Sequence, residues 1–253
     1  MSSGTVKEKM VVDGVRNPED ISHALQPIID GASQVFLPPV LQFRFFAGYN
    51  AWLKVSHPEH AIPDDEMTGM EVRLPGLLAG AMVFYCHRNA DNQADVVLTG
   101  QLAWEYACLC RKTWKYDGVV FNPTRRMKLA DRGLARPAGF YAMRLPKEDR
   151  SAGIGKRFQR MAVQSVRQTL IQDWGMASEG LQIMAITHPH YPELMDGNKI
   201  PFIDLPGLAV DPDGVGSFIH APCLRFHDGE LGLYCFRVEG ANPGYGSGSL
   251  QQC

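Results

Sequence analysis

The chain has 253 residues, of which 45% are hydrophobic and 21% are charged, and its formal net charge is −2. This composition excludes the disordered and collagen-like classes, and a chain of this length buries enough surface to fold without disulfides. The N-terminal residues lack the apolar core of a secretory signal, and Gly and Pro interrupt the longest apolar-rich run, at residues 74–86. We therefore expect a cytoplasmic protein that does not enter a membrane.

The sequence predicts one α+β domain over residues 17–240, because helical and strand patterns alternate without the rhythm of repeated βαβ units. Residues 1–16 are expected to form a flexible arm, and the Gly-rich residues 241–253 a disordered tail.

Four elements are expected in the N-terminal half. Asn17-Pro18 begins a helix over residues 17–29, with Asn as the cap and Pro at the first helical position. Residues 34–46 have a β-like composition, and the Pro38-Pro39 pair places that strand at an edge or a bend. The His and acidic residues of 57–66 are expected in a solvated loop. Apolar residues spaced by threes and fours then predict an amphipathic helix over residues 99–115.

The C-terminal half contains the clearest helical pattern of the chain. From Ser151 to Trp174, apolar residues recur every three or four positions and Gly175 follows, which predicts one long helix. Asp228-Gly229 predicts a two-residue hairpin loop between antiparallel strands. The strands expected in this half are residues 119–121, 139–145, 181–186, 217–226 and 230–239.

Positive charge is concentrated in the middle of the chain. Residues 111–167 contain fifteen Lys and Arg but only four acids, a net charge of +11, whereas the remainder carries −13. Such a division bears on the partners of a protein rather than on its fold. It favours a polyanion as ligand, although a basic surface can also be solvated or pair with an acidic protein.

The arrangement of these charges points to nucleic acid. On the predicted long helix, Lys156, Arg160 and Arg167 share a polar face that can follow a phosphate backbone. Phe140 and Tyr141 of a predicted strand offer rings on which bases could stack. The residues taken as phosphate contacts are Arg125, Arg126, Lys128, Arg132, Lys156, Arg157, Arg160 and Arg167.

These features favour a non-catalytic nucleic-acid-binding protein without a cofactor, acting as a subunit of a larger assembly. The sequence does not distinguish DNA from RNA. An adaptor that binds an acidic protein partner is one alternative.

A metal-dependent enzyme is the other alternative. His188 and His190 are separated by one residue, so on an extended chain both imidazoles point the same way. Glu193 or His220 would complete a set of ligands for a divalent metal.

Overall fold

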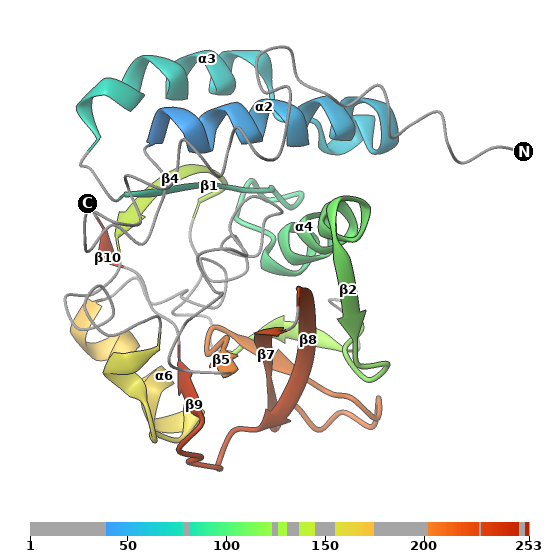
Figure 1. The fold of residues 1–253 in the computed structure, drawn as a ribbon, viewed down its shortest axis with the longest axis vertical. Coiled ribbons are helices and arrows are strands. Elements are labelled where there is room, and N and C mark those ends of the chain that lie inside the picture. Colours follow the sequence, from blue (N-terminus) through green and yellow to red (C-terminus); the bar gives the residue numbers. More distant parts are fainter. Residues whose placement is uncertain are drawn as a thin grey trace, which may run out of the picture. The chain divides into compact units, whose positions relative to one another are not determined.

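We describe a computed structural model of the chain (Figure 1). The structure describes residues 39–77, 81–122, 126–130, 137–144, 155–174, 202–227, 229–247 and 251–252. The predicted arm, the helix at residues 17–29 and the strand at residues 181–186 lie outside these ranges. The chain divides into two compact units, Met1–Met82 and Val83–Cys253, within the segment for which the sequence predicts one domain. Helices and mixed sheets together make the fold α+β.

The described part of the first unit is helical, and it corrects the strand predicted at residues 34–46. Helix α2 spans Pro39–Ser56 and therefore includes residues 39–46 of that segment. Pro39 opens the helix, a position where the missing N–H costs nothing. Phe46, Tyr49 and Leu53 are buried at spacings of three and four residues, so they form one helix face.

The acidic segment is also helical rather than a loop. After the short 3-10 helix η1 (Pro58–His60), helix α3 runs over Asp64–Arg73, and a second 3-10 turn, η2, covers Leu74–Gly76. The three acids at 64–66 occupy the first turn of α3, where negative charge is favourable against the positive end of the helix dipole.

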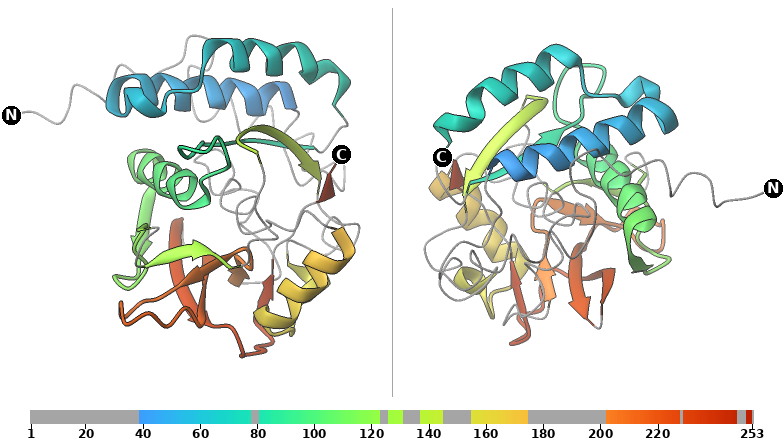
Figure 2. Two further views of the ribbon diagram at one scale, coloured as in Figure 1. Left: turned by 180° about the vertical axis from the view of Figure 1, so that it is seen from behind. Right: turned by 45° about the horizontal axis from the view of Figure 1, so that its top comes forward.

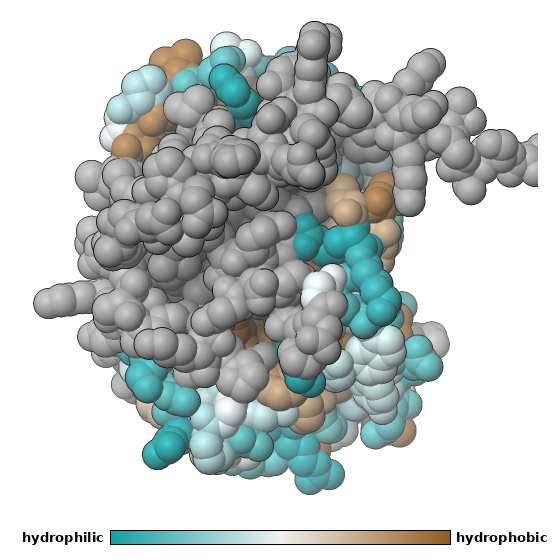
Figure 3. All heavy atoms as spheres, viewed as in Figure 1, coloured by the Kyte–Doolittle hydropathy of each residue, from teal (hydrophilic) through white to brown (hydrophobic). Residues whose placement is uncertain are grey.

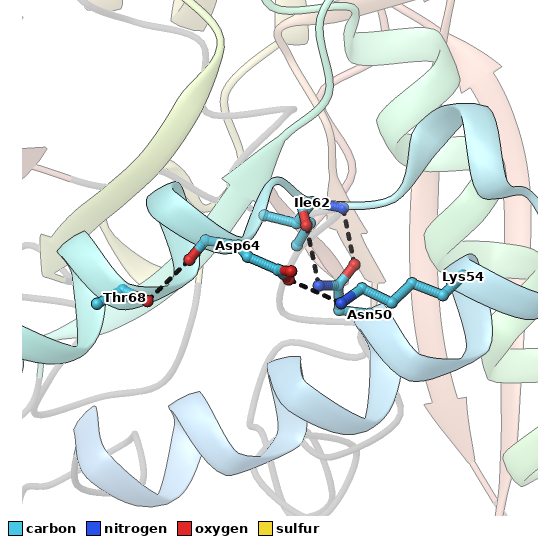
Figure 4. Close-up of polar contacts among 5 residues, drawn as sticks. All are labelled: Asn50, Lys54, Ile62, Asp64 and Thr68. Carbon is cyan, nitrogen blue, oxygen red and sulfur yellow. Dashed lines mark hydrogen bonds and ion pairs between the residues drawn. The ribbon is translucent and has the colours of Figure 1, made fainter.

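The connection between α2 and α3 is fixed by polar contacts (Figure 4). The buried Asn50 accepts a hydrogen bond from Ile62 N–H at 2.7 Å and donates one to Ile62 O at 3.1 Å. On the exposed side, Lys54 Nζ lies 2.7 Å from Asp64 Oδ1. Asn50 therefore satisfies both backbone groups of a buried loop residue.

In the second unit, helix α4 spans Val96–Cys110 and is followed at once by strand β2, Lys112–Lys115. Asp95 caps the helix, because its Oδ1 accepts from the backbone N–H groups of Val97 and Leu98. The prediction that the helix continues to residue 115 is wrong at this end, where the chain becomes extended.

The predicted long basic helix is not formed. The described part of residues 151–174 contains a 3-10 turn, η4 (Lys156–Phe158), and then helix α6 (Val163–Trp174). Gly155 and Arg160 have φ values of 87° and 67°, and this left-handed backbone cannot continue a right-handed helix. The apolar spacing is real, since Phe158, Val163 and Val166 are buried, but two elements supply it.

Two sheets complete the second unit (Figures 1 and 2). The smaller sheet has the order β1-β4-β10, and the larger has the order β2-β8-β7-β5-β9, with β3 and β6 paired beside it. The smaller sheet contains β1 (Met82–Cys86), β4 (Gly139–Arg144) and β10 (Gln251–Gln252). The other strands are β3 (Met127–Leu129), β5 (Phe202–Asp204), β6 (Leu208–Val210), β7 (His220–His227), β8 (Glu230–Arg237) and β9 (Tyr245–Ser247).

Strands β7 and β8 pair antiparallel along their whole length, from His220 opposite Arg237 to His227 opposite Glu230. Residues 119–121 do not form the predicted strand, because Val119 N–H instead closes a turn onto Tyr116 O at 2.9 Å. Strands β5 and β6 lie in a stretch where no strand was predicted from the sequence.

The prediction of a disordered tail is wrong for the described part of residues 241–253. Strand β9 pairs parallel with β5, and β10 pairs antiparallel with β4. Gly and Ser have low strand propensity, but cross-strand contacts outweigh that preference. Tyr245 stacks on Phe202 with ring centroids 4.5 Å apart, and Ser247 is fully buried.

Candidate nucleic-acid interface

Five aromatic side chains gather on one face of the larger sheet. Tyr234 and Phe236 alternate along β8, so both point to the same side. Trp114 of β2 lies opposite Gly232, and Phe202 of β5 lies opposite Tyr245 of β9. We call Trp114, Phe202, Tyr234, Phe236 and Tyr245 the aromatic face.

The rings contact one another both across neighbouring strands and across strands that are not neighbours. The ring centroid of Phe236 lies 5.8 Å from that of Phe202 and 4.9 Å from that of Tyr245, both in edge-to-face contacts. The ring centroids of Tyr234 and Trp114 are 4.6 Å apart. Strands β8 and β9 are separated by β7 and β5, which in a flat sheet places them about 14 Å apart. Large side chains from strands that are not neighbours therefore meet on this face.

A glycine makes room for this packing. A Cβ atom at Gly232 would lie 2.5 Å from Cε2 of Tyr234, closer than any contact that a side chain tolerates. The ring of Tyr234 therefore lies over the backbone of its own strand at Gly232. Glycine at this position lets Tyr234 and Trp114 pack against each other at the β2 edge.

Buried polar groups lie in the same sheet, one pleat from the rings of β5 and β9. Asp204 is in register with Cys223 of β7 and Ser247 of β9, and all three are buried. Burial raises the pKa of Asp204 to about 7, although the nearby Arg167 guanidinium opposes this rise. Burial, and then Cys223 and Asp204, raise the pKa of Tyr245 to about 12.

Cationic side chains border the aromatic face. The guanidinium of Arg225 on β7 lies 5.2 Å from the centre of the Phe202 ring. Beside β9, Arg160 is exposed and its backbone N–H donates to Tyr245 O at 3.3 Å. At the β2 edge Lys112 is exposed, with Nζ 3.4 Å from Glu230 Oε2. Among the described residues, the Arg225 guanidinium thus lies over a ring of the aromatic face, and the backbone of Arg160 is hydrogen-bonded to the backbone of β9.

The predicted phosphate contacts at residues 125–128 are Arg125, Arg126 and Lys128. Arg125 lies outside the described residues, and so does the predicted contact Arg132. Arg126 is half-buried, and its Nη1 donates to Asp211 O at 3.2 Å and to Pro212 O at 2.6 Å. Lys128 is exposed on β3, with its Nζ 3.9 Å from the centre of the Phe218 ring. Arg126 therefore holds a loop, and only Lys128 of the described pair is exposed.

The predicted shared face of Lys156, Arg160 and Arg167 is wrong, because the three residues do not lie on one helix. Lys156 and Arg157 belong to η4, Arg160 follows it in a left-handed conformation, and Arg167 belongs to α6. The Arg167 guanidinium donates to Pro206 O at 2.7 Å and Leu208 O at 2.6 Å, and burial lowers its pKa to about 10. It joins α6 to the chain between β5 and β6, where these carbonyls use its hydrogen bonds.

The predicted stacking groups Phe140 and Tyr141 pack within the smaller sheet. The Phe140 ring is 5.0 Å from that of Tyr85, and the Tyr141 ring is stacked 5.4 Å from that of Phe84. Phe84 and Tyr85 are buried, and Phe140 and Tyr141 are half-buried against them.

The proposed metal ligands His188, His190 and Glu193 lie outside the described residues. His220 is on β7, and its buried Nδ1 has no hydrogen-bond partner in the described part of the chain. Within these ranges no group of three or more His, Cys, Asp or Glu side chains converges as a metal site would require.

The aromatic face was not predicted from the sequence. The alternation of Tyr234 and Phe236 was a usable signal, since both fall in a predicted strand. Trp114, Phe202 and Tyr245 join them only through the pairing of strands far apart in the chain.

Of the helices in the described ranges, none combines the length and the apolar character needed to cross a bilayer. On the side of the molecule drawn in Figure 3, hydrophobic atoms of the described residues lie in small groups among hydrophilic ones. Scattered apolar exposure of this kind is ordinary for a protein surface.

Comparisons with protein-family models, with curated protein sequences and with solved structures give no match.

Proposed function

We propose that this protein binds nucleic acid through the aromatic face, without catalysing a reaction and as a subunit of a larger assembly. The observation that carries the proposal is the grouping of five rings on one sheet face with the Arg225 guanidinium over Phe202. Aromatic rings that stack with bases, combined with cations that contact phosphates, are the usual elements of a nucleic-acid-binding surface.

The distribution of charge supports the same proposal. Two parts of the basic segment, residues 111–167, border the aromatic face at opposite edges of the sheet. Strand β2 contributes Trp114 and Lys112 at one edge, and the chain around η4 contributes Arg160 next to β9 at the other. The positive segment that the sequence indicated is thus adjacent to the rings at both edges.

A cytoplasmic location is part of the proposal. The five cysteines in the described ranges are free thiols, which is the state favoured in a reducing compartment.

The proposal predicts binding that weakens steeply with salt, because each phosphate neutralised by a cation releases a counterion. We expect replacement of Arg160 and Arg225 by Ala to flatten the slope of log K against log salt by about one to two units. The matched control replaces Arg44 and Arg73, two exposed arginines of the first unit, by Ala and should leave the slope unchanged.

Binding can be measured by fluorescence anisotropy of a labelled oligonucleotide. The salt concentration is varied from about 20 to about 200 mM, where counterion release dominates the salt dependence of binding. Lack of binding to any oligonucleotide at the lowest salt would reject the proposal. An equal loss of slope in both double variants would mean that the cations act through overall charge rather than at this face.

A further inference from the structure

We infer that the ligand is single-stranded nucleic acid and that its unpaired bases stack on Trp114 and Phe236. This inference rests on the proposed function and names the class of ligand and the two rings that contact it.

The exposure of the five rings separates them into two groups. Trp114 is 44% exposed and Phe236 is 38% exposed, while Phe202, Tyr234 and Tyr245 are half-buried. Phe202 and Tyr245 stack on each other at an interplanar angle of 6°, so each already covers one face of the other. Phe236 meets both of these rings edge to face, at 85°, a contact that leaves its own orientation fixed.

Trp114 is held in a comparable way at the other end of the aromatic face. Its ring is tilted by 37° against Tyr234, whose position over Gly232 is set by the absence of a Cβ there. Both exposed rings are therefore supported from behind by rings that are partly buried. A supported, exposed ring loses little side-chain entropy when a base stacks on it.

The geometry favours single strands over duplexes. In a duplex the faces of the bases are covered by their neighbours, and proteins read base edges in the grooves instead. Rings on a sheet present flat surfaces that suit the faces of unpaired bases. Arg225 at Phe202 and Arg160 beside Tyr245 then lie near a strand that crosses from β2 toward β9.

A proline-rich peptide is another ligand that docks on exposed aromatic rings. The two arginines and the net charge of the segment from residue 111 to residue 167 favour a polyanion over such a peptide. A polyproline peptide therefore serves as a competing probe.

The experiment measures binding of the full chain to a labelled oligothymidine, to the same length of blunt duplex and to a polyproline peptide, at low salt. The variants are Trp114→Ala and Phe236→Ala. Tyr116→Ala is the matched control, because Tyr116 is 46% exposed but, among the described residues, makes no ring contact with the aromatic face. Stacking of one base corresponds to a change of roughly tenfold to a hundredfold in affinity.

We expect the single strand to bind more tightly than the duplex, and Trp114→Ala and Phe236→Ala each to weaken it by about tenfold or more. Tyr116→Ala should change the affinity by less than about twofold. Circular dichroism and urea midpoints check folding, and Trp114→Phe and Phe236→Leu replace any variant that does not fold. Trp114→Phe should retain most of the affinity for the single strand, because it keeps an aromatic ring at this position.

Three results would overturn the inference. Duplex binding as tight as single-strand binding, with no loss in either ring variant, would reject it and leave the proposed function intact. Tighter binding of the polyproline peptide would assign the face to a peptide. Absence of binding to both nucleic acids would reject the proposed function itself.

Discussion

The buried carboxyl group of Asp204 predicts an unusual dependence of stability on pH, and Asp204→Asn tests it. This side chain is 4% exposed, and burial raises its pKa from 3.8 to about 7, against the opposing effect of Arg167. The folded state holds the proton of Asp204 more tightly than the unfolded state does. The contribution of Asp204 to the free energy of unfolding is therefore greatest below about pH 4 and is lost as pH rises to about 7. Each pKa unit of difference between the folded and unfolded states corresponds to about 1.4 kcal/mol, so the loss of stability amounts to roughly 4 kcal/mol.

The assay is urea unfolding of the parent and the variant at several pH values from about 4 to 8. Asparagine has nearly the same shape and does not titrate, so the other groups of the chain cancel in the comparison. We expect the free energy of unfolding of Asp204→Asn, relative to the parent, to rise by up to about 4 kcal/mol across this range. An unpaired amide in the variant adds a constant offset and does not change with pH.

Asp211→Asn is a control with the opposite sign. Burial of Asp211 favours the neutral form, but the backbone N–H groups of Gly216, Gly214 and Val215 and the Arg126 guanidinium outweigh it and lower the pKa of Asp211. Its contribution is present at neutral pH and is lost on acidification, so the variant should be destabilised most at neutral pH. A stability difference for Asp204→Asn that stays constant from about pH 4 to pH 8 would refute the reasoning.

Two further predictions concern single residues in the two units. Asn50→Ala should destabilise the protein by about 2–4 kcal/mol, because it leaves the buried N–H and C=O of Ile62 unpaired. Lys54→Ala breaks only an exposed ion pair and should cost less than about 1 kcal/mol. Equal losses of stability in urea unfolding would contradict this prediction. Gly155→Ala should lower the free energy of unfolding by about 1–3 kcal/mol, because φ at Gly155 is 87° and the new Cβ would lie 2.9 Å from Gly246 O. Gly69→Ala is the control: a Cβ at Gly69 in α3 meets open space, so this variant should be more stable by about 0.5–1 kcal/mol. Opposite shifts in thermal midpoint are the expected readout, and a shift in the same direction would count against the backbone argument.

Elements with a strong local signal were predictable from the sequence. The strand at residues 139–145 matches β4, and most of the helix at 99–115 matches α4, because alternation and helical spacing are visible within one segment. At the end of α4, pairing of residues 112–115 with β8 outweighs the helical pattern.

The misses have local backbone causes. The Pro38-Pro39 pair was interpreted as a strand bend, whereas proline is equally suited to the first turn of a helix. In residues 151–174 the apolar spacing suggested continuity, but the left-handed Arg160 separates η4 from α6, and the left-handed Gly155 directly precedes η4. Glycine signals such a position, whereas an arginine with positive φ has no local signature.

The candidate site was the least predictable part. Charge asymmetry is visible in the sequence, but whether an arginine is free depends on tertiary contacts, as the buried hydrogen bonds of Arg167 show. The three-residue strands β5 and β9 are too short to give a periodic signal, and they bring Phe202 and Tyr245 into the aromatic face.

The position of β9 in the sheet has a consequence for synthesis of the chain. Strand β5 is made some forty residues before the strand that completes its outer edge, since β9 begins at Tyr245. Until those residues leave the ribosome, β5 presents unpaired backbone groups, and the ring of Phe202 lacks the stacking contact with Tyr245. An open edge of this kind pairs readily with other chains. Nascent chains that stall before Tyr245 should therefore be the species that aggregates or recruits chaperones.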